Sequence, residues 1–167
     1  GARTPRVAGR SRRETGGVVR GHRCDILNLE WNSQGRDIDI VEPVLSYLEL
    51  RYGYRVVRES IYDAYGKLTH YRPRLLLTSN QGGARINAAA VKIAANLGVR
   101  VVSLVSEGDY PDDDDELVRR FFWGWNADLR FYEDMHLEWT QRAVDLIHRA
   151  IPDAVGFDMR VTGATGF

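Results

Sequence analysis

Arg100-Val101-Val102-Ser103-Leu104-Val105-Ser106-Glu107-Gly108-Asp109 is a short run dense in β-branched residues that ends in a carboxylate, a glycine and a second carboxylate. A helix-like segment that ends at Leu97-Gly98 precedes it, so the sequence predicts an inner parallel strand of an α/β sheet. In open α/β sheets, ligands bind in a crevice outside the carboxyl ends of the strands. We therefore expect Glu107, Gly108 and Asp109 to face a binding site.

Further strand-like and helix-like segments alternate on both sides of this run. Predicted strands cover 24–29, 54–57, 74–78, 128–132 and 159–162, and predicted helices cover 37–52, 60–71, 84–97, 112–122 and 134–150. Pro43 lies in the first helix, where it either belongs to a first turn that begins near Ile40 or kinks the helix. The alternation predicts an α/β fold, a Rossmann-like three-layer α/β/α domain with a mostly parallel six-stranded sheet.

The composition is that of an ordinary folded domain. The 167 residues are 44% hydrophobic and 28% charged, and we assign the domain to residues 24–167. No apolar run approaches the roughly 18 to 20 residues that a membrane-spanning helix needs, and we expect no secretory leader. The single cysteine, Cys24, excludes an internal disulfide and fits a reducing compartment, so we expect a cytoplasmic protein.

Residues 1–23 form a basic tail. They hold seven arginines against one acid, Glu14, so they carry a charge of +6 and the rest of this neutral chain carries −6. We expect a flexible, solvated tail. The alternative is that it attracts an anionic surface, which would give peripheral contact with the inner membrane. Sequence-specific nucleic-acid recognition is not expected, because the tail has neither interleaved aromatic residues nor helical periodicity.

The two acids after the central strand are candidate catalytic groups. A carboxylate beside a glycine can approach a ligand closely and take a proton from it, so we name Glu107 as the general base and Asp109 as the reserve. The alternative is that they are loop acids that cap the next helix. The five acids at 112–116 point around a helix rather than converge, and no histidine pair has zinc-ligand spacing, so no metal site is expected.

Two loops and one histidine are candidate binding elements. Asn80, Gln81, Gly82 and Gly83 precede a helix whose free N–H groups could hold a phosphate or a sugar hydroxyl, although a structural turn explains them equally well. Trp31 and Asn32 follow the first strand, where the indole either stacks on a sugar ring or packs internally. His136 is a further candidate at the predicted crevice. The closing glycines at 163 and 166 lack the third glycine of a dinucleotide fingerprint, so we expect no cofactor.

Segments 74–80, 84–98, 105–108, 125–139 and 161–163 together resemble the amino-terminal half of GT-B glycosyltransferases. The resemblance is to bacterial surface-carbohydrate biosynthesis proteins related to the CDP-glycerol glycerophosphotransferase-like group. It implies that this domain holds a glycan acceptor, and that a second domain grips the nucleotide-sugar donor. The chain alone would then be inactive, and Glu107 would remove a proton from the acceptor hydroxyl.

Two other functions remain open at this point. One is a non-catalytic α/β module that binds a nucleotide or a protein through the same crevice. The other is half of a nucleotide-sugar epimerase, which needs no acceptor. The sequence also leaves open whether the chain forms oligomers through Trp123 and Trp125.

Overall fold

The computed structural model describes residues 23–31, 34–79, 84–106, 110–111, 114–124 and 130–163. Strands and helices alternate along the chain. In order they are β1 (Ile26–Glu30), α1 (Arg36–Tyr52), β2 (Val56–Ser60), α2 (Ala64–Tyr71), β3 (Leu75–Ser79), α3 (Arg85–Asn96), β4 (Arg100–Leu104), α4 (Asp115–Trp123), β5 (Met135–Glu138), α5 (Gln141–Ala150), the 3-10 helix η1 (Pro152–Gly156) and β6 (Met159–Val161).

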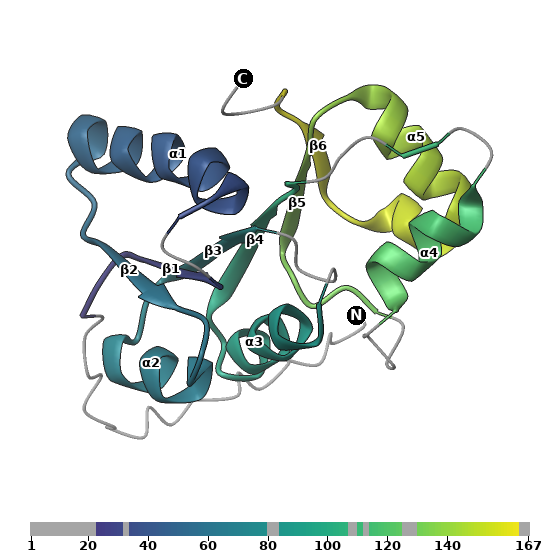
Figure 1. The fold of residues 1–167 in the computed structure, drawn as a ribbon. Coiled ribbons are helices and arrows are strands. Elements are labelled where there is room, and N and C mark those ends of the chain that lie inside the picture. Colours follow the sequence, from purple (N-terminus) through teal and green to yellow (C-terminus); the bar gives the residue numbers. More distant parts are fainter. Residues whose placement is uncertain are drawn as a thin grey trace, which may run out of the picture.

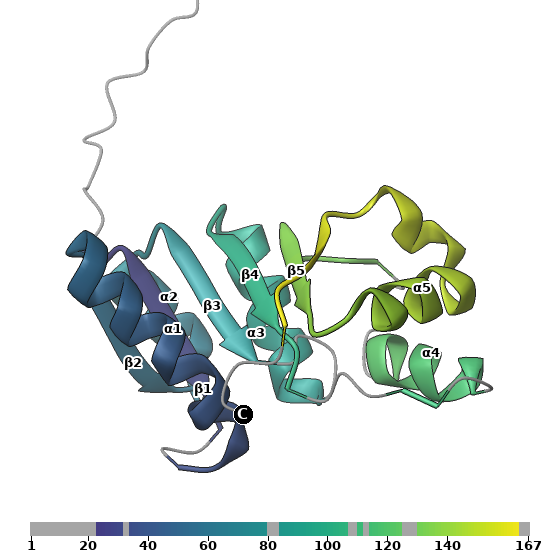
Figure 2. The same cartoon turned by 90° about the horizontal axis from the view of Figure 1, so that it is seen from above.

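All six strands lie in one parallel sheet of order β2-β1-β3-β4-β5-β6. Helix α1 covers one face of the sheet, and α2 and α3 cover the other (Figure 1). Helices α4 and α5 pack on each other beside β5 and β6 (Figure 2). The predicted α/β fold, with a Rossmann-like architecture, is therefore confirmed.

The core lies on both faces of the sheet because strand side chains alternate in direction. Leu27 and Leu29 of β1 pack toward α2 and α3, whereas Ile26 packs toward α1. On α3 the buried positions include Ala90 and Ala94. These small side chains let the helix lie close to the sheet. In the parts of the chain that the structure describes, no helix is both long enough and apolar enough to cross a membrane.

The predicted strand at 128–132 is wrong over its described residues, and the helix predicted at 134–150 starts too early. Of that strand, residues 130–132 have no strand structure, and the rest lies outside the described residues. Strand β5 instead occupies Met135–Glu138, and α5 begins after Thr140, whose Oγ accepts a hydrogen bond of 3.1 Å from the N–H of Ala143. The buried positions of β5 are His136 and Glu138, which are polar. The sequence therefore lacks the alternation of apolar and polar residues that predicts a strand.

Smaller differences concern the first half of the chain. Helix α1 begins at Arg36 and runs through Pro43 in its interior, so the proposed first-turn position of this proline is wrong. Strand β2 extends to Ser60, and α2 starts only at Ala64, after Asp63, whose carboxylate accepts from the N–H of Gly66.

Truncation of the central strand should be costly. Leu76 of β3 is 0% exposed, so Leu76→Ala removes buried methyl groups and leaves a cavity. We expect the free energy of unfolding to fall by about 2–5 kcal/mol, measured by urea denaturation. Leu50→Ala is the matched control, because Leu50 is 89% exposed, and it should change stability by no more than about 0.5 kcal/mol. Equal effects of the two substitutions would contradict this assignment of the core.

Candidate functional site

The switch point of the sheet lies between β1 and β3. The chain leaves β1 through α1 over one face and leaves β3 through α3 over the other, while the two strands are neighbours (Figure 1). Open α/β proteins bind ligands at the carboxyl ends of the strands at such a point. The backbone register of these strands joins residues 26–28 to residues 75–77. Beyond that register, side chains connect the last two residues of each strand.

Glu30, the last residue of β1, makes the main connection. Its Oε1 accepts hydrogen bonds from the backbone N–H of Ser79 at 2.9 Å and from Asn28 Nδ2 at 3.0 Å. Its Oε2 accepts a bond of 2.6 Å from Ser79 Oγ. Next to them, Thr78 Oγ1 donates to the carbonyl of Leu29 at 3.1 Å. A carboxylate in a residue that is 2% exposed thus ties the ends of two neighbouring strands together.

Burial gives the Glu30 carboxyl an unusual titration. Removal from water raises the pKa of Glu30 to about 7, although the hydrogen bonds from Ser79 and Asn28 act in the opposite direction. The nearby charge of Asp37 adds to the increase. A carboxyl with this pKa exists in both protonation states near neutral pH, so it can accept or release a proton there.

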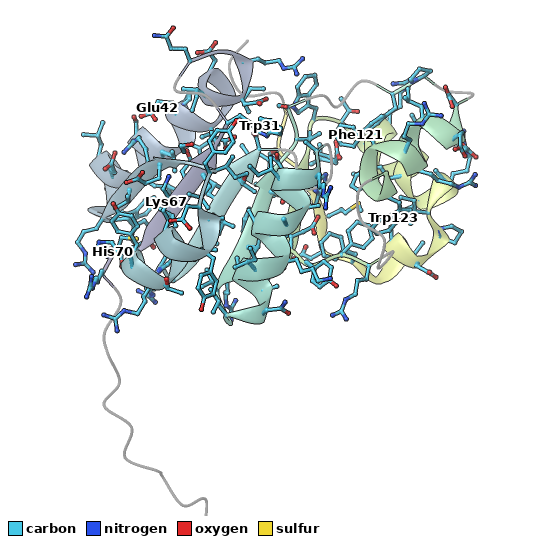
Figure 3. All side chains as sticks on the ribbon, turned by 60° about the horizontal axis from the view of Figure 1, so that its bottom comes forward. Trp31, Glu42, Lys67, His70, Phe121 and Trp123 are labelled. Carbon is cyan, nitrogen blue, oxygen red and sulfur yellow. The ribbon has the colours of Figure 1, made fainter. Side chains whose placement is uncertain are left out.

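Trp31 follows Glu30 and lies at the rim of the site. Its indole N–H donates to Asn87 Oδ1 on α3, and Asn87 Nδ2 donates to the carbonyl of Ser79 at 3.1 Å. Trp31 nevertheless stays 37% exposed. Figure 3 shows Trp31 at the same end of the molecule as Glu42. The indole is therefore held in place by one edge and is still accessible to a ligand.

A cavity of about 550 Å³ adjoins β1, β2 and α1, and we call it the switch-point cavity. Its lining includes Asn28, Glu30, Trp31, Glu42, Arg58 and Ser60. This volume is within the range of small-molecule sites.

The positive charge of Arg58 in this cavity is already held by two carboxylates. Its guanidinium donates to both oxygens of Glu42, at 2.7 and 2.8 Å, and to Glu49 at 2.6 Å. These bonds lower the pKa of Glu42 and raise the pKa of Arg58. The described lining therefore has carboxylate, amide and hydroxyl groups without a surplus cation. Such a lining favours a neutral, hydroxyl-rich ligand over a phosphate.

Most residues predicted to form the site lie outside the described residues. They are Asn32, Asn80, Gln81, Gly82, Gly83, Glu107, Gly108 and Asp109. Their roles stay predictions. Sequence reasoning missed Glu30, Asn28 and Ser79. The signal that could have found them is a set of polar residues at the ends of two predicted neighbouring strands, because the carboxyl ends of parallel strands share one edge.

His136 is buried beside two glutamates. It is 0% exposed, and its ring centroid lies 5.2 Å from that of Phe122 on α4. Its Nε2 is 2.7 Å from Glu138 Oε1, and its Nδ1 is 3.6 Å from Glu133 Oε1. Burial opposes the charged imidazolium, but the two carboxylates outweigh it and raise the pKa of His136 to about 9. His136 is not part of the lining of the switch-point cavity, and its contact with substrate stays a prediction.

Within the described residues, no group of three histidine, cysteine or acidic side chains could hold a metal ion. The aromatic residues Phe121, Phe122 and Trp123 pack on one another and on Phe131. They form the core between α4 and α5 rather than part of the switch-point cavity. The sequence matches no protein-family model, and no curated protein matches it significantly.

Replacing Glu30 by glutamine should change how stability depends on pH. The folded-state pKa of Glu30, about 7, lies above its ordinary value of 4.5. The stability that the protonated carboxyl provides is therefore complete below pH 4.5 and is lost as the pH rises through 7. Relative to Glu30→Gln, the wild type should lose roughly 3 kcal/mol of unfolding free energy between about pH 4.5 and pH 8.

Urea denaturation over this pH range measures that difference, with Glu42→Gln as the control from the same cavity. Because the pKa of Glu42 is lowered, its contribution to stability should be lost as the pH falls, which is the opposite direction. A stability difference between wild type and Glu30→Gln that stays constant with pH would contradict the buried, proton-binding state of Glu30.

Proposed function

We propose that this chain is the acceptor-side domain of a glycosyltransferase in surface-polysaccharide biosynthesis. In this proposal it binds a glycan acceptor at the switch-point cavity, and a second domain holds the nucleotide sugar. The observation that carries the proposal is the Glu30 carboxyl, which has a pKa of about 7, connects β1 to β3 at the switch point, and lines a neighbouring cavity of about 550 Å³ between β1, β2 and α1. The GT-B resemblance of the sequence points to the same class of activity.

The chemistry of the cavity fits a carbohydrate. An accessible indole such as that of Trp31 offers an apolar face to a sugar ring, and carboxylate and amide oxygens accept hydrogen bonds from its hydroxyl groups. Arg58 is neutralised by Glu42 and Glu49, so the donor's phosphates would find little attraction here. The lining therefore supports binding of the acceptor in this cavity and binding of the donor at another site.

The proposed reaction transfers the sugar to an acceptor hydroxyl. The hydroxyl oxygen forms a bond to the anomeric carbon, the nucleotide leaves with the electron pair of the broken bond, and the hydroxyl proton passes to a carboxylate. Glu107 is the proposed general base, with Asp109 in reserve. Because nucleotide sugars are the donors, we place this activity in the cytoplasm.

Acceptor binding can be tested by titration calorimetry on the 167-residue chain. We expect oligosaccharide acceptors to bind more tightly than nucleotide sugars, and Trp31→Ala to weaken acceptor binding about tenfold through loss of the stacking face. Tyr65→Ala is the control, because Tyr65 is 61% exposed on α2 and is not part of the cavity lining. Tight binding of a nucleotide sugar without acceptor binding would identify a nucleotide-binding module and reject the proposal.

The general base can be tested in the protein together with its donor domain. Glu107→Gln should lower kcat by about 10²- to 10⁴-fold, with little effect on acceptor KM, because the amide keeps the shape but cannot take the proton. Asp109→Asn is the matched variant. Near-normal turnover of Glu107→Gln with a large loss in Asp109→Asn would move the role to Asp109, and near-normal turnover of both would reject this mechanism.

A further inference from the structure

The amino edge of the sheet, opposite the switch-point cavity, is bordered by arginines. Arg55 directly precedes β2, Arg74 directly precedes β3, and Arg100 is the first residue of β4. The strand order β2-β1-β3-β4 spaces these residues along one edge. The side chains of Arg55 and Arg74 are 62% and 64% exposed, and Arg100 is also exposed.

Asp25, just before β1, faces two of these arginines. Its carboxylate oxygens lie 3.7 Å from Arg55 Nε and 3.9 Å from Arg74 Nη1. Ion pairs this long and this exposed are weak. Asp134, just before β5, lies next to the start of β4, because its carboxylate accepts a hydrogen bond of 2.8 Å from the N–H of Val101. The three arginines, Asp25 and Asp134 together carry a net positive charge.

A second cavity lies on this edge. It has a volume of about 600 Å³, and its lining includes Leu48, Tyr54, Arg74 and Arg100. Gly98, also in the lining, has a φ of 73°, a conformation that favours glycine. The arginines therefore border a recess rather than a flat surface.

Exposed aromatic and apolar residues adjoin this cavity at the end of α1. Tyr47, Leu50, Tyr52 and Tyr54 are 57%, 89%, 59% and 42% exposed. The ring of Tyr52 lies 5.9 Å from those of Tyr47 and Tyr54. Tyr54 lines the cavity together with Arg74 and Arg100, so it connects the tyrosines at the end of α1 to the arginines. We call the following residues the amino-edge face: Tyr47, Leu50, Tyr52, Tyr54, Arg55, Arg74 and Arg100. Figure 2 shows the end of α1 on the same side of the molecule as the beginnings of the strands.

The two edges of the sheet differ in charge. In the switch-point cavity, Glu42 and Glu59 are paired with Arg58 and Lys67, whereas arginines outnumber the acids named on the amino-edge face. Helices α1, α2 and α3 end at the amino edge, and their dipoles favour cations there. The dipoles help to explain the arginines, but they do not explain exposed Leu50 and three exposed tyrosines beside them.

We propose that the amino-edge face docks on an anionic lipid bilayer. Arginines near an anionic membrane are attracted to its headgroups, and tyrosine rings are enriched at the membrane–water interface. Insertion of an exposed leucine into the bilayer removes its apolar surface from water, which lowers the free energy. Residues 1–22 contain six further arginines and join the domain at Arg23, just before β1, at this same edge. Docking in this orientation leaves the switch-point cavity facing away from the bilayer.

The test is sedimentation of the full 167-residue chain with vesicles. Vesicles of phosphatidylcholine alone are compared with vesicles that contain about 30% phosphatidylglycerol, since the charged lipid supplies the attraction. We expect binding to the anionic vesicles only, and a loss of about 10- to 30-fold in Arg74→Gln/Arg100→Gln. The matched control is Arg85→Gln/Arg120→Gln, which removes the same charge from exposed positions on α3 and α4 and should weaken binding no more than about twofold.

Leu50→Ala provides a second variant, one that preserves all charges and is not expected to disturb folding. It should weaken binding to the anionic vesicles several-fold by removing the inserted side chain. Equal losses in the two arginine pairs, or no binding to anionic vesicles, would overturn the proposal. A fall in the melting temperature of Arg74→Gln/Arg100→Gln with unchanged vesicle binding would also overturn it. In that case the two arginines would only stabilise the fold through the dipoles of the neighbouring helices. Binding to duplex DNA or self-association instead of vesicle binding would also overturn it.

Discussion

The carboxyl group of Glu30 holds together the two strands at which the fold changes direction. Strands β1 and β3 carry the chain toward opposite faces of the sheet, and the hydrogen bonds of Glu30 to Ser79 and Asn28 join them where their backbone register has stopped. A buried carboxyl with three donors fixes this edge firmly. The same burial raises its pKa to about 7. The same side chain therefore connects the two strands and can exchange a proton near neutral pH.

The charges of the domain are arranged along the strand direction. Around the switch-point cavity the carboxylates are paired with cations, Glu42 and Glu49 with Arg58 and Glu59 with Lys67. The opposite edge has arginines at the beginnings of β2, β3 and β4. A domain with this arrangement has a preferred orientation in any electric field, including the field of a charged surface. The proposed acceptor site and the proposed membrane-facing surface would therefore act at opposite ends of one rigid sheet.

The sequence predicted those parts of the fold in which local pattern and tertiary role agree. The apolar runs of β1, β3 and β4 are buried strands, and the predicted α/β class is confirmed. Strand β5 was missed because its inward side chains include His136 and Glu138, which are polar. The ion pair between them, which offsets the cost of burying their charges, is visible only in the structure. Glu30 was missed because an acid after an apolar run looks like the start of a loop. Its partner Ser79 is 49 positions away in the sequence, so no local pattern contains the pair.

The buried cluster of Glu133, His136 and Glu138 limits how this sequence can evolve. One imidazolium lies between two carboxylates beneath Phe122, without contact with water. Losing one partner of a buried ion pair typically costs about 3–5 kcal/mol, whereas replacing the whole set by apolar residues can be neutral. Natural variants should therefore keep all three residues or exchange all three together. In an alignment of homologous chains, these three positions should therefore covary. Anciently diverged groups of homologues should each have either the charged set or an apolar set.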